Sequence, residues 1–287
     1  TSSRPIPPTI KNAFLCLETN SPAFFAASAL FFAPFAAVCA AAAAISVQAH
    51  AEDTKVLRMA CESTYAPFVF FDSETGKLKG FEIDLLEYVA KDMGRKLEVT
   101  NMGFDAIIPS MLTGITDVGA SAFTITPERA KRVLFSKPYY ISGLSILVRA
   151  EDKDKIKSVK DIENCTICAQ IGTSGSMRAA KVPGAKVRNF NTINDAYLEL
   201  GNKGCKAVIT DRPVTAYFLA ARPETAKTYY HLPEVLNSES FGFPVSKNKP
   251  ELMKAIDAAI DKARTSGEFT KMYVKWFGEE PPKELLK

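Results

Sequence analysis

The chain has 287 residues, of which 47% are hydrophobic and 24% are charged, as is usual for a protein with a packed core. Its net charge of +4, from 36 basic and 32 acidic residues, is too balanced for the clustered basic surface of a nucleic-acid-binding protein. The two histidines, His50 and His231, give little support to histidine-based catalysis or to a histidine-rich metal site.

The first predicted element is an apolar segment near the N-terminus. Residues 19–51 contain no Asp, Glu, Lys or Arg and are rich in Ala and Phe. An uncharged run of this length is typical of a membrane-targeting segment. It ends in Ala49-His50-Ala51, a small-x-small pattern that signal peptidase accepts. We therefore predict that residues 1–51 are a signal peptide or an N-terminal membrane segment, and that the protein is exported.

Two other interpretations of this segment stay open. An uncleaved anchor has the same hydrophobicity, and the basic flank of Arg4 and Lys11, opposed by Glu18, is thinner than in a standard signal peptide. A lipoprotein would need Cys39 as its acylated residue, but the bulky Val38 stands where such sites require a small side chain. A periplasmic or extracytoplasmic location is expected in each case, with a lipid or transmembrane tether as the alternative to a free protein.

Short strands and helices alternate after this segment. An apolar strand is predicted at 56–60, and an amphipathic helix at 81–93 places its apolar residues at 3.6-residue spacing before Gly94, which suits its C-terminal cap. The next predicted elements are a strand at 97–99, a helix at 105–112 and strands at 117–122 and 144–148.

The same alternation continues to the end of the chain. The predicted strands are 166–169, 186–190, 207–210 and 241–245, and the predicted helices are 176–181, 193–200, 213–221, 251–264 and 268–276. Strand–helix alternation is typical of parallel α/β sheets, and about ten strands predict two of them. The charged stretch 151–160 is either a surface link near a change of lobe or an ordinary loop and helix start.

Four cysteines lie beyond the N-terminal segment: Cys61, Cys165, Cys168 and Cys205. Export would place them in an oxidising compartment. Cys165 and Cys168 have C-x-x-C spacing, but no second such pair supplies the two further ligands that zinc requires. Two alternatives stay open: a disulfide joining Cys205 to Cys165 or Cys168, or free buried thiols.

Eight short motifs, or landmarks, follow one another along the chain in the order typical of one protein family. They are 64–68 (TYAPF), 80–85 (GFEIDL), 104–109 (FDAIIP), 124–129 (TITPER), 135–140 (FSKPYY), 172–173 (GT), Asp211 and 275–278 (KWFG). With them the chain resembles the solute-binding proteins of the polar amino acid ABC transporter family, from about residue 55 to residue 278. Any one landmark alone is weak, but all eight at compatible spacing are specific.

The resemblance implies a two-lobed periplasmic-binding-protein fold of type II. Each lobe would be a mainly parallel α/β sheet flanked by helices, with a two-stranded hinge between them. We expect lobe 1 at 52–147 plus 243–287 and lobe 2 at 148–242. A ligand in the cleft would favour closure of the lobes. The implied partners are a free amino acid and a membrane ABC permease, and we expect a monomer without metal, cofactor or nucleic acid.

The charged ends of a free amino acid require two opposite charges from a receptor. Arg129 matches the family arginine, and its planar guanidinium is implied to bind the carboxylate. Asp211 matches the family's ammonium-binding Asp and follows a predicted strand, where ligands of α/β sheets bind. The alternatives are a surface arginine beside Lys131 and Arg132, and a helix N-cap for Asp211.

Hydroxyl and small residues are implied to complete the carboxylate site. Thr124 matches a donor of a hydroxyl or backbone N–H, and Ser121 and Ala122 occupy the matching strand end. Thr173 and Ser174 open a helix whose N–H groups would meet the carboxylate from the side opposite the arginine. Simple strand termination and N-capping are the alternatives.

Four further residues are implied to meet the ligand side chain. Tyr65 and Phe104 match aromatic positions that enclose its aliphatic part, and Glu62 and Gln170 lie near its end. A carboxylate at position 62 favours a side chain with N–H donors or positive charge, so we expect arginine, lysine, histidine, glutamine or cystine rather than glutamate or aspartate.

Two other functions stay open. One is an extracytoplasmic amino-acid sensor that acts through a partner. The other is a dehydratase-type enzyme on the same fold, in which Glu62 would protonate a leaving hydroxyl. Because an Asp and an Arg already account for the cleft without chemistry, we predict a binding protein that is not an enzyme.

Overall fold

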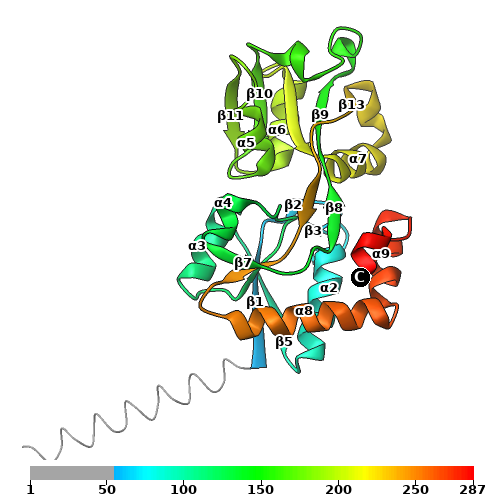
Figure 1. Cartoon of the computed structure of the whole chain (residues 1–287). Coiled ribbons are helices and arrows are strands. Elements are labelled where there is room, and N and C mark those ends of the chain that lie inside the picture. The colour runs from blue at the N-terminus through cyan, green and yellow to red at the C-terminus, as the bar shows by residue number, and fades with distance from the viewer. Residues whose placement is uncertain (1–54) are drawn as a thin grey trace, which may run out of the picture. The chain divides into compact units, whose positions relative to one another are not determined.

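The computed structural model describes residues 55–287, and the predicted export segment, residues 1–51, lies outside them. Within the described part, no helix has the length and apolarity needed to cross a bilayer. Its strands and helices form two α/β lobes (Figure 1).

The first lobe is built on a five-stranded sheet with the order β5-β1-β6-β15-β7. Its strands are β1 (Val56–Cys61), β5 (Lys96–Asn101), β6 (Val118–Gly119), β7 (Val133–Phe135) and β15 (Pro244–Ser246). β1 runs parallel to β5 and β6, whereas β15 runs antiparallel to β6 and β7. A small antiparallel sheet follows β1 and consists of β2 (Thr64–Tyr65), β3 (Val69–Phe71) and β4 (Leu78–Lys79).

Helices pack around the first sheet through their apolar sides. They are α2 (Phe81–Asp92), α3 (Phe104–Leu112), α4 (Pro127–Ala130), α8 (Pro250–Thr265) and α9 (Glu268–Phe277). α3 contacts β1, β6 and β15, and α2 packs against α8 and α9. The ring centroid of Phe81 on α2 lies 5.8 Å from those of both Phe269 and Tyr273 on α9, which packs these two helices together.

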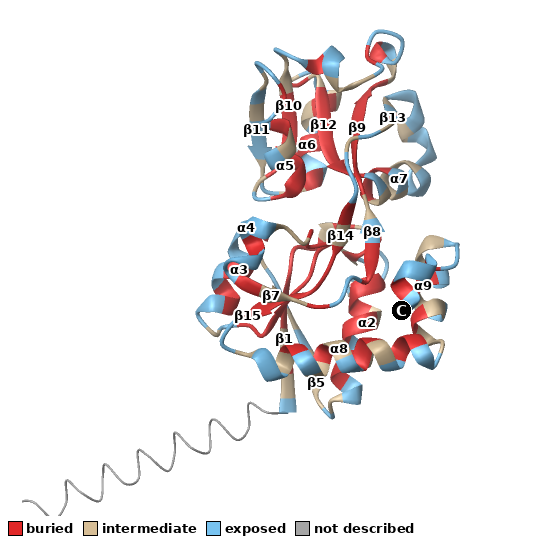
Figure 2. Cartoon of the chain, in the orientation of Figure 1, coloured by how far each residue is buried: buried red, intermediate tan, exposed pale blue. Residues whose placement is uncertain are grey.

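The second lobe has the strand order β11-β10-β12-β9-β13. Its strands are β9 (Leu144–Arg149), β10 (Thr166–Gln170), β11 (Lys186–Phe190), β12 (Ala207–Asp211) and β13 (Tyr229–Val235), and its helices are α5 (Ser174–Ala179), α6 (Ile193–Gly201) and α7 (Arg212–Ala221). β10 is parallel to β11 and β12, and β9 is antiparallel to β12 and β13. β9 is buried along its whole length (Figure 2). Residues 144–147, expected in lobe 1, therefore pair within the second sheet.

Two antiparallel strands connect the lobes: β8 (Tyr140–Ser142) and β14 (Glu239–Phe241). The predicted strand at 241–245 is thus two strands, because β14 belongs to this connection and β15 to the first sheet. At the break, the N–H of Gly242 donates to the carbonyl of Phe123 at 3.1 Å. The N–H of Phe243 donates to the Ser136 hydroxyl at 2.8 Å. These two bonds turn the chain from the connection into the first lobe.

The four cysteines of the described part are free thiols. The predicted alternative of a disulfide with Cys205 is therefore not formed in the structure. Cys168, in β10, and Cys205, just before β12, nevertheless have interacting side chains. Cys165 is half-buried, and the other three are buried.

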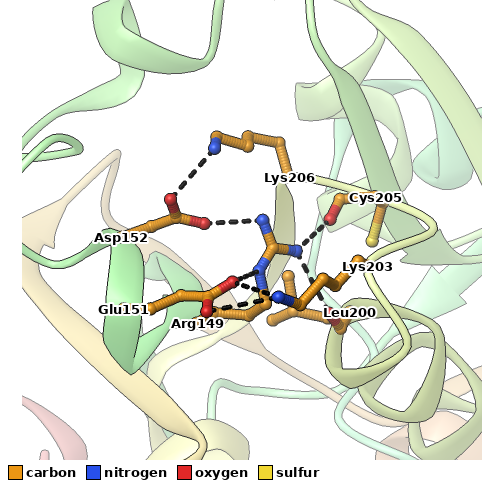
Figure 3. Close-up of polar contacts among 7 residues, drawn as sticks. All are labelled: Arg149, Glu151, Asp152, Leu200, Lys203, Cys205 and Lys206. Atoms are coloured by element: carbon orange, nitrogen blue, oxygen red, sulfur yellow. Dashed lines mark hydrogen bonds and ion pairs between the residues drawn. The ribbon is translucent and has the colours of Figure 1, made fainter.

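A buried arginine organises one end of the second lobe (Figure 3). The guanidinium of Arg149 donates to the carbonyls of Leu200 at 3.2 Å and Cys205 at 2.7 Å, and to Asp152 at 2.6 Å. Lys206 pairs with the other oxygen of Asp152 at 3.0 Å. The turn between α6 and β12 is thereby fixed against the end of β9.

Replacing this arginine by lysine tests the network. A lysine ammonium does not reproduce the planar fork, so at least one buried carbonyl or carboxylate loses its donor. We expect Arg149→Lys to lower the free energy of unfolding by about 2–4 kcal/mol, measured by urea denaturation. Arg132→Lys, at an exposed position, should change it by less than about 0.5 kcal/mol. Equal effects of the two substitutions would contradict a structural role for the Arg149 network.

Candidate functional site

Arg129 is a buried cation without a carboxylate partner in the described chain. It lies on α4, where the Thr126 side chain caps the helix by accepting the Arg129 N–H at 3.2 Å. Its guanidinium donates to the carbonyls of Thr124 at 2.8 Å and Gly172 at 3.0 Å, one from each lobe. None of the ion pairs among residues 55–287 includes Arg129, although it is only 7% exposed.

Two aromatic rings complete the surroundings of this guanidinium. Phe104 and Phe123 are stacked with centroids 4.4 Å apart, and the guanidinium carbon of Arg129 lies 5.4 Å and 5.1 Å from their centroids. Burial lowers the pKa of Arg129, yet an arginine stays protonated at neutral pH. Asp211 and Glu239 attract this cation, but neither forms an ion pair with it, so the desolvated guanidinium can still accept an anion at close range.

The carboxylate of Asp211 provides the negative charge that is opposite to the Arg129 cation. It ends β12 and is 2% exposed. It occupies the N-cap position of α7, but its side chain makes no capping hydrogen bond. The carboxylate instead accepts the Tyr65 hydroxyl, and the Ser142 hydroxyl lies at 3.5 Å. Burial, with a further contribution from Glu239, raises the pKa of Asp211 to about 7. Arg129 opposes this rise, but no ion pair among residues 55–287 includes Asp211.

Both charges line one pocket, which is closed so tightly that it holds no space for a water molecule. The predicted residues that the structure brings together around it are Tyr65, Phe104, Ser121, Ala122, Thr124, Arg129, Thr173, Ser174 and Asp211. The lobes touch here, since Tyr65 contacts Asp211 and the hydroxyls of Thr124 and Ser174 are 3.1 Å apart. A ligand can reach so small a pocket only when the lobes separate.

Glu62 and Gln170, predicted at the ligand side chain, pair beside the pocket rather than lining it. The Gln170 amide donates to Glu62 at 2.9 Å, and Thr64 donates through its N–H at 3.1 Å and its hydroxyl at 2.8 Å. Burial raises the pKa of Glu62. The other amide atom of Gln170, Oε1, is buried and has no hydrogen-bond partner among the described residues.

A buried carboxylate holds the pocket floor. Ser121 and Ala122 have positive φ angles of 98° and 52°, which L-residues rarely adopt. Glu82 accepts their N–H groups at 2.7 Å and 2.8 Å and also the Tyr139 hydroxyl. The Ser121 hydroxyl in turn accepts the Glu62 N–H at 2.8 Å and donates to the Glu62 carbonyl at 2.9 Å. This chain of bonds positions Glu62, and burial raises the pKa of Glu82 to about 7.

The predicted hydroxyl residues of the carboxylate site make different contacts in the structure. Thr173 caps α5, because its oxygen accepts the Ser176 N–H at 3.2 Å and donates to the Gln170 carbonyl at 2.7 Å. The hydroxyls of Thr124 and Ser174 both donate to Glu239. The capping alternative is thus realised for Thr173, which also lines the pocket.

The sequence analysis assigned no role to Glu239 or Glu82. Glu82 stands in the GFEIDL landmark, where its position between the apolar residues Phe81 and Ile83 was the available signal. Glu239 precedes an apolar stretch and carries no motif. Its position becomes evident only when the two lobes are in place.

Comparison with known proteins identifies a matching family and similar proteins. The model of the bacterial extracellular solute-binding proteins, family 3, matches residues 57–279. A probable histidine-binding protein of Campylobacter jejuni is 32% identical over 227 residues, which are 79% of this chain and 86% of that protein.

The fold is also similar to those of solved structures. The arginine-, lysine-, histidine-binding protein ArtJ from Geobacillus stearothermophilus has a TM-score of 0.75 and 33% identity, covering 81% of this chain and 99% of that one. The ancestral amino acid-binding protein AncCDT-1, a precursor of cyclohexadienyl dehydratase, has a TM-score of 0.72 and 35% identity, covering 79% and 97%. The chain belongs to the bacterial extracellular solute-binding proteins, family 3.

Proposed function

We propose that the protein binds a free L-amino acid between its lobes and delivers it to an ABC permease outside the cytoplasm. The observation that carries this proposal is the presence of Arg129 and Asp211 in one pocket, where both are desolvated and attract each other without forming an ion pair within the described residues. A zwitterion neutralises both charges at once. Its carboxylate would pair with Arg129 and its ammonium with Asp211.

The ligand class follows from the remaining charges. Glu62, Asp211 and Glu239 are buried carboxylates, and Arg129 is the cation among them. The unpartnered Oε1 of Gln170, next to Glu62, adds an acceptor that needs an N–H donor. A ligand side chain with positive charge or N–H groups suits these negative surroundings and offers a donor to Gln170 Oε1, whereas a second carboxylate would be repelled. We therefore propose arginine, lysine, histidine, glutamine or cystine, in agreement with the names of the relatives.

Binding without catalysis is favoured over a dehydratase-type reaction. Glu62, the acid that such a reaction would use, is hydrogen-bonded to Gln170 and Thr64 and does not line the pocket. His231 lies on β13, where it pairs with Leu147 in the second sheet.

A ligand screen tests the proposed class. A ligand at about 100 times its Kd adds about 2.7 kcal/mol to the stability of the folded state. For a protein of this size, that raises Tm by about 5–10 °C. Each amino acid is tested singly by thermal unfolding. We expect one of the five named amino acids to give the largest rise in Tm. Stabilisation by glutamate or aspartate alone would contradict the class, and no shift with any amino acid would contradict the function.

Removing the guanidinium tests the carboxylate site. We expect Arg129→Ala to weaken binding of L-arginine at least 100-fold by calorimetry, because the ligand carboxylate then lies buried without a cation. The unliganded variant should keep its Tm, since it no longer buries an unpaired charge. Arg132→Ala, at an exposed position three residues on, is the matched control and should bind within about twofold of the wild type. Unchanged affinity of Arg129→Ala would refute the assigned pocket.

The pH dependence of binding tests the ammonium site. The pKa of Asp211 is about 7 in the free protein and should fall when an ammonium pairs with it. Binding then releases a proton, so affinity for L-arginine is full above pH 7 and decreases about tenfold for each pH unit below it. Asp211→Asn should bind weakly at every pH and lose this dependence on Asp211. A wild-type Kd that is constant from pH 5 to pH 8 would argue against the assignment.

A further inference from the structure

Glu239 occupies an unusual place for a carboxylate. It begins β14, one of the two strands that connect the lobes, and pairs with Ser142 of β8. It is 8% exposed, and no ion pair among residues 55–287 includes it. Hydrogen-bond donors therefore have to satisfy its charge.

Those donors come from both lobes and from the connection itself. Its Oε2 accepts the Thr124 hydroxyl from the first lobe at 2.7 Å and the Ser174 hydroxyl from the second lobe at 2.8 Å. Its Oε1 accepts the Asn237 amide at 2.8 Å. The carbonyl oxygen of that amide accepts the N–H of Leu144, which opens β9 of the second lobe, at 3.0 Å.

This arrangement exists only when the lobes are close. One oxygen atom can receive both hydroxyls only if Thr124 and Ser174 approach each other, and their oxygens are 3.1 Å apart. Each hydroxyl has a single proton, so a proton donated to Glu239 is not available to the ligand. Thr124 and Ser174, which both line the pocket, are thus held in place by Glu239 when the lobes are close.

We propose that Glu239 is a positioning residue of the ligand site: it stabilises lobe closure by holding the Thr124 and Ser174 hydroxyls on one carboxylate oxygen. It acts through these two residues rather than by touching the ligand. Bonds to a charged acceptor are about twice as strong as neutral ones, which favours a carboxylate at this position over an amide. The inference rests on the proposed function only for the identity of the ligand.

Glu239→Gln tests the proposal with L-arginine as the probe. The amide keeps the size of the side chain but loses the charge and one acceptor. We expect Kd to rise at least tenfold, mainly through faster dissociation in stopped-flow measurements, with an unchanged near-ultraviolet circular dichroism spectrum. Glu128→Gln removes the same charge from an exposed position on α4 and should change Kd by less than twofold. A Kd of Glu239→Gln within twofold of the wild type would overturn the proposal.

A double-mutant cycle tests the route through the hydroxyls. In a Ser174→Ala background, one of the two interlobe donors is already absent, so Glu239→Gln should raise Kd less than threefold further. If the two effects multiply in full, Glu239 acts independently of Ser174 and the proposed route is wrong.

A measurement without ligand separates this inference from the proposed function. In a background with Cys165→Ser, which removes the half-buried native thiol, spin labels at Lys91→Cys in the first lobe and Lys181→Cys in the second report the interlobe distance by double electron–electron resonance. Glu239→Gln is compared with Glu128→Gln. We expect Glu239→Gln alone to shift the distribution to longer distances. If wild-type protein does not bind L-arginine, the proposed ligand fails, and an unshifted distribution then overturns the role of Glu239 as well.

Discussion

The burial of two opposite charges that the described chain does not pair is the constraint on which the site depends. Removing Arg129 and Asp211 from water is unfavourable, and the protein offsets only part of it with carbonyl groups, the faces of two phenyl rings and the Tyr65 hydroxyl. Contacts between the lobes, from Arg129 to the Gly172 carbonyl and from Tyr65 to Asp211, complete this burial when the lobes close. A zwitterion held between the two charges then forms two ion pairs in a site without water.

The topology decides where such a pair can stand. Asp211 ends a strand of the second sheet, and Arg129 follows a strand end of the first, so each charge belongs to a different lobe. The pocket forms where these edges face each other across β8 and β14. Glu82 and Glu239 then act as internal supports. One holds the strained Ser121–Ala122 turn within the first lobe, and the other joins the two lobes.

Much of the fold and most pocket residues were predictable because their signals are local. Periodicity located α2 and β1, and compact landmarks contain Tyr65, Thr124 and Arg129. β7 was missed because it is an edge strand of only three residues, too short to show a periodic pattern. Glu239 was missed for another reason. Its donors lie 115 and 65 residues away in the sequence, so nothing near it indicates its partners.

The discontinuous first sheet has a consequence for the order of folding. β15 sits between β6 and β7, although the whole second lobe separates it from them in the chain. A chain emerging from its N-terminus therefore cannot complete the first sheet until residue 246 is available, whereas the second sheet is complete by residue 235. Contacts between such distant segments form slowly. The N-terminal half thus remains without its full core until nearly the entire chain is free, a property compatible with passage through a membrane before folding.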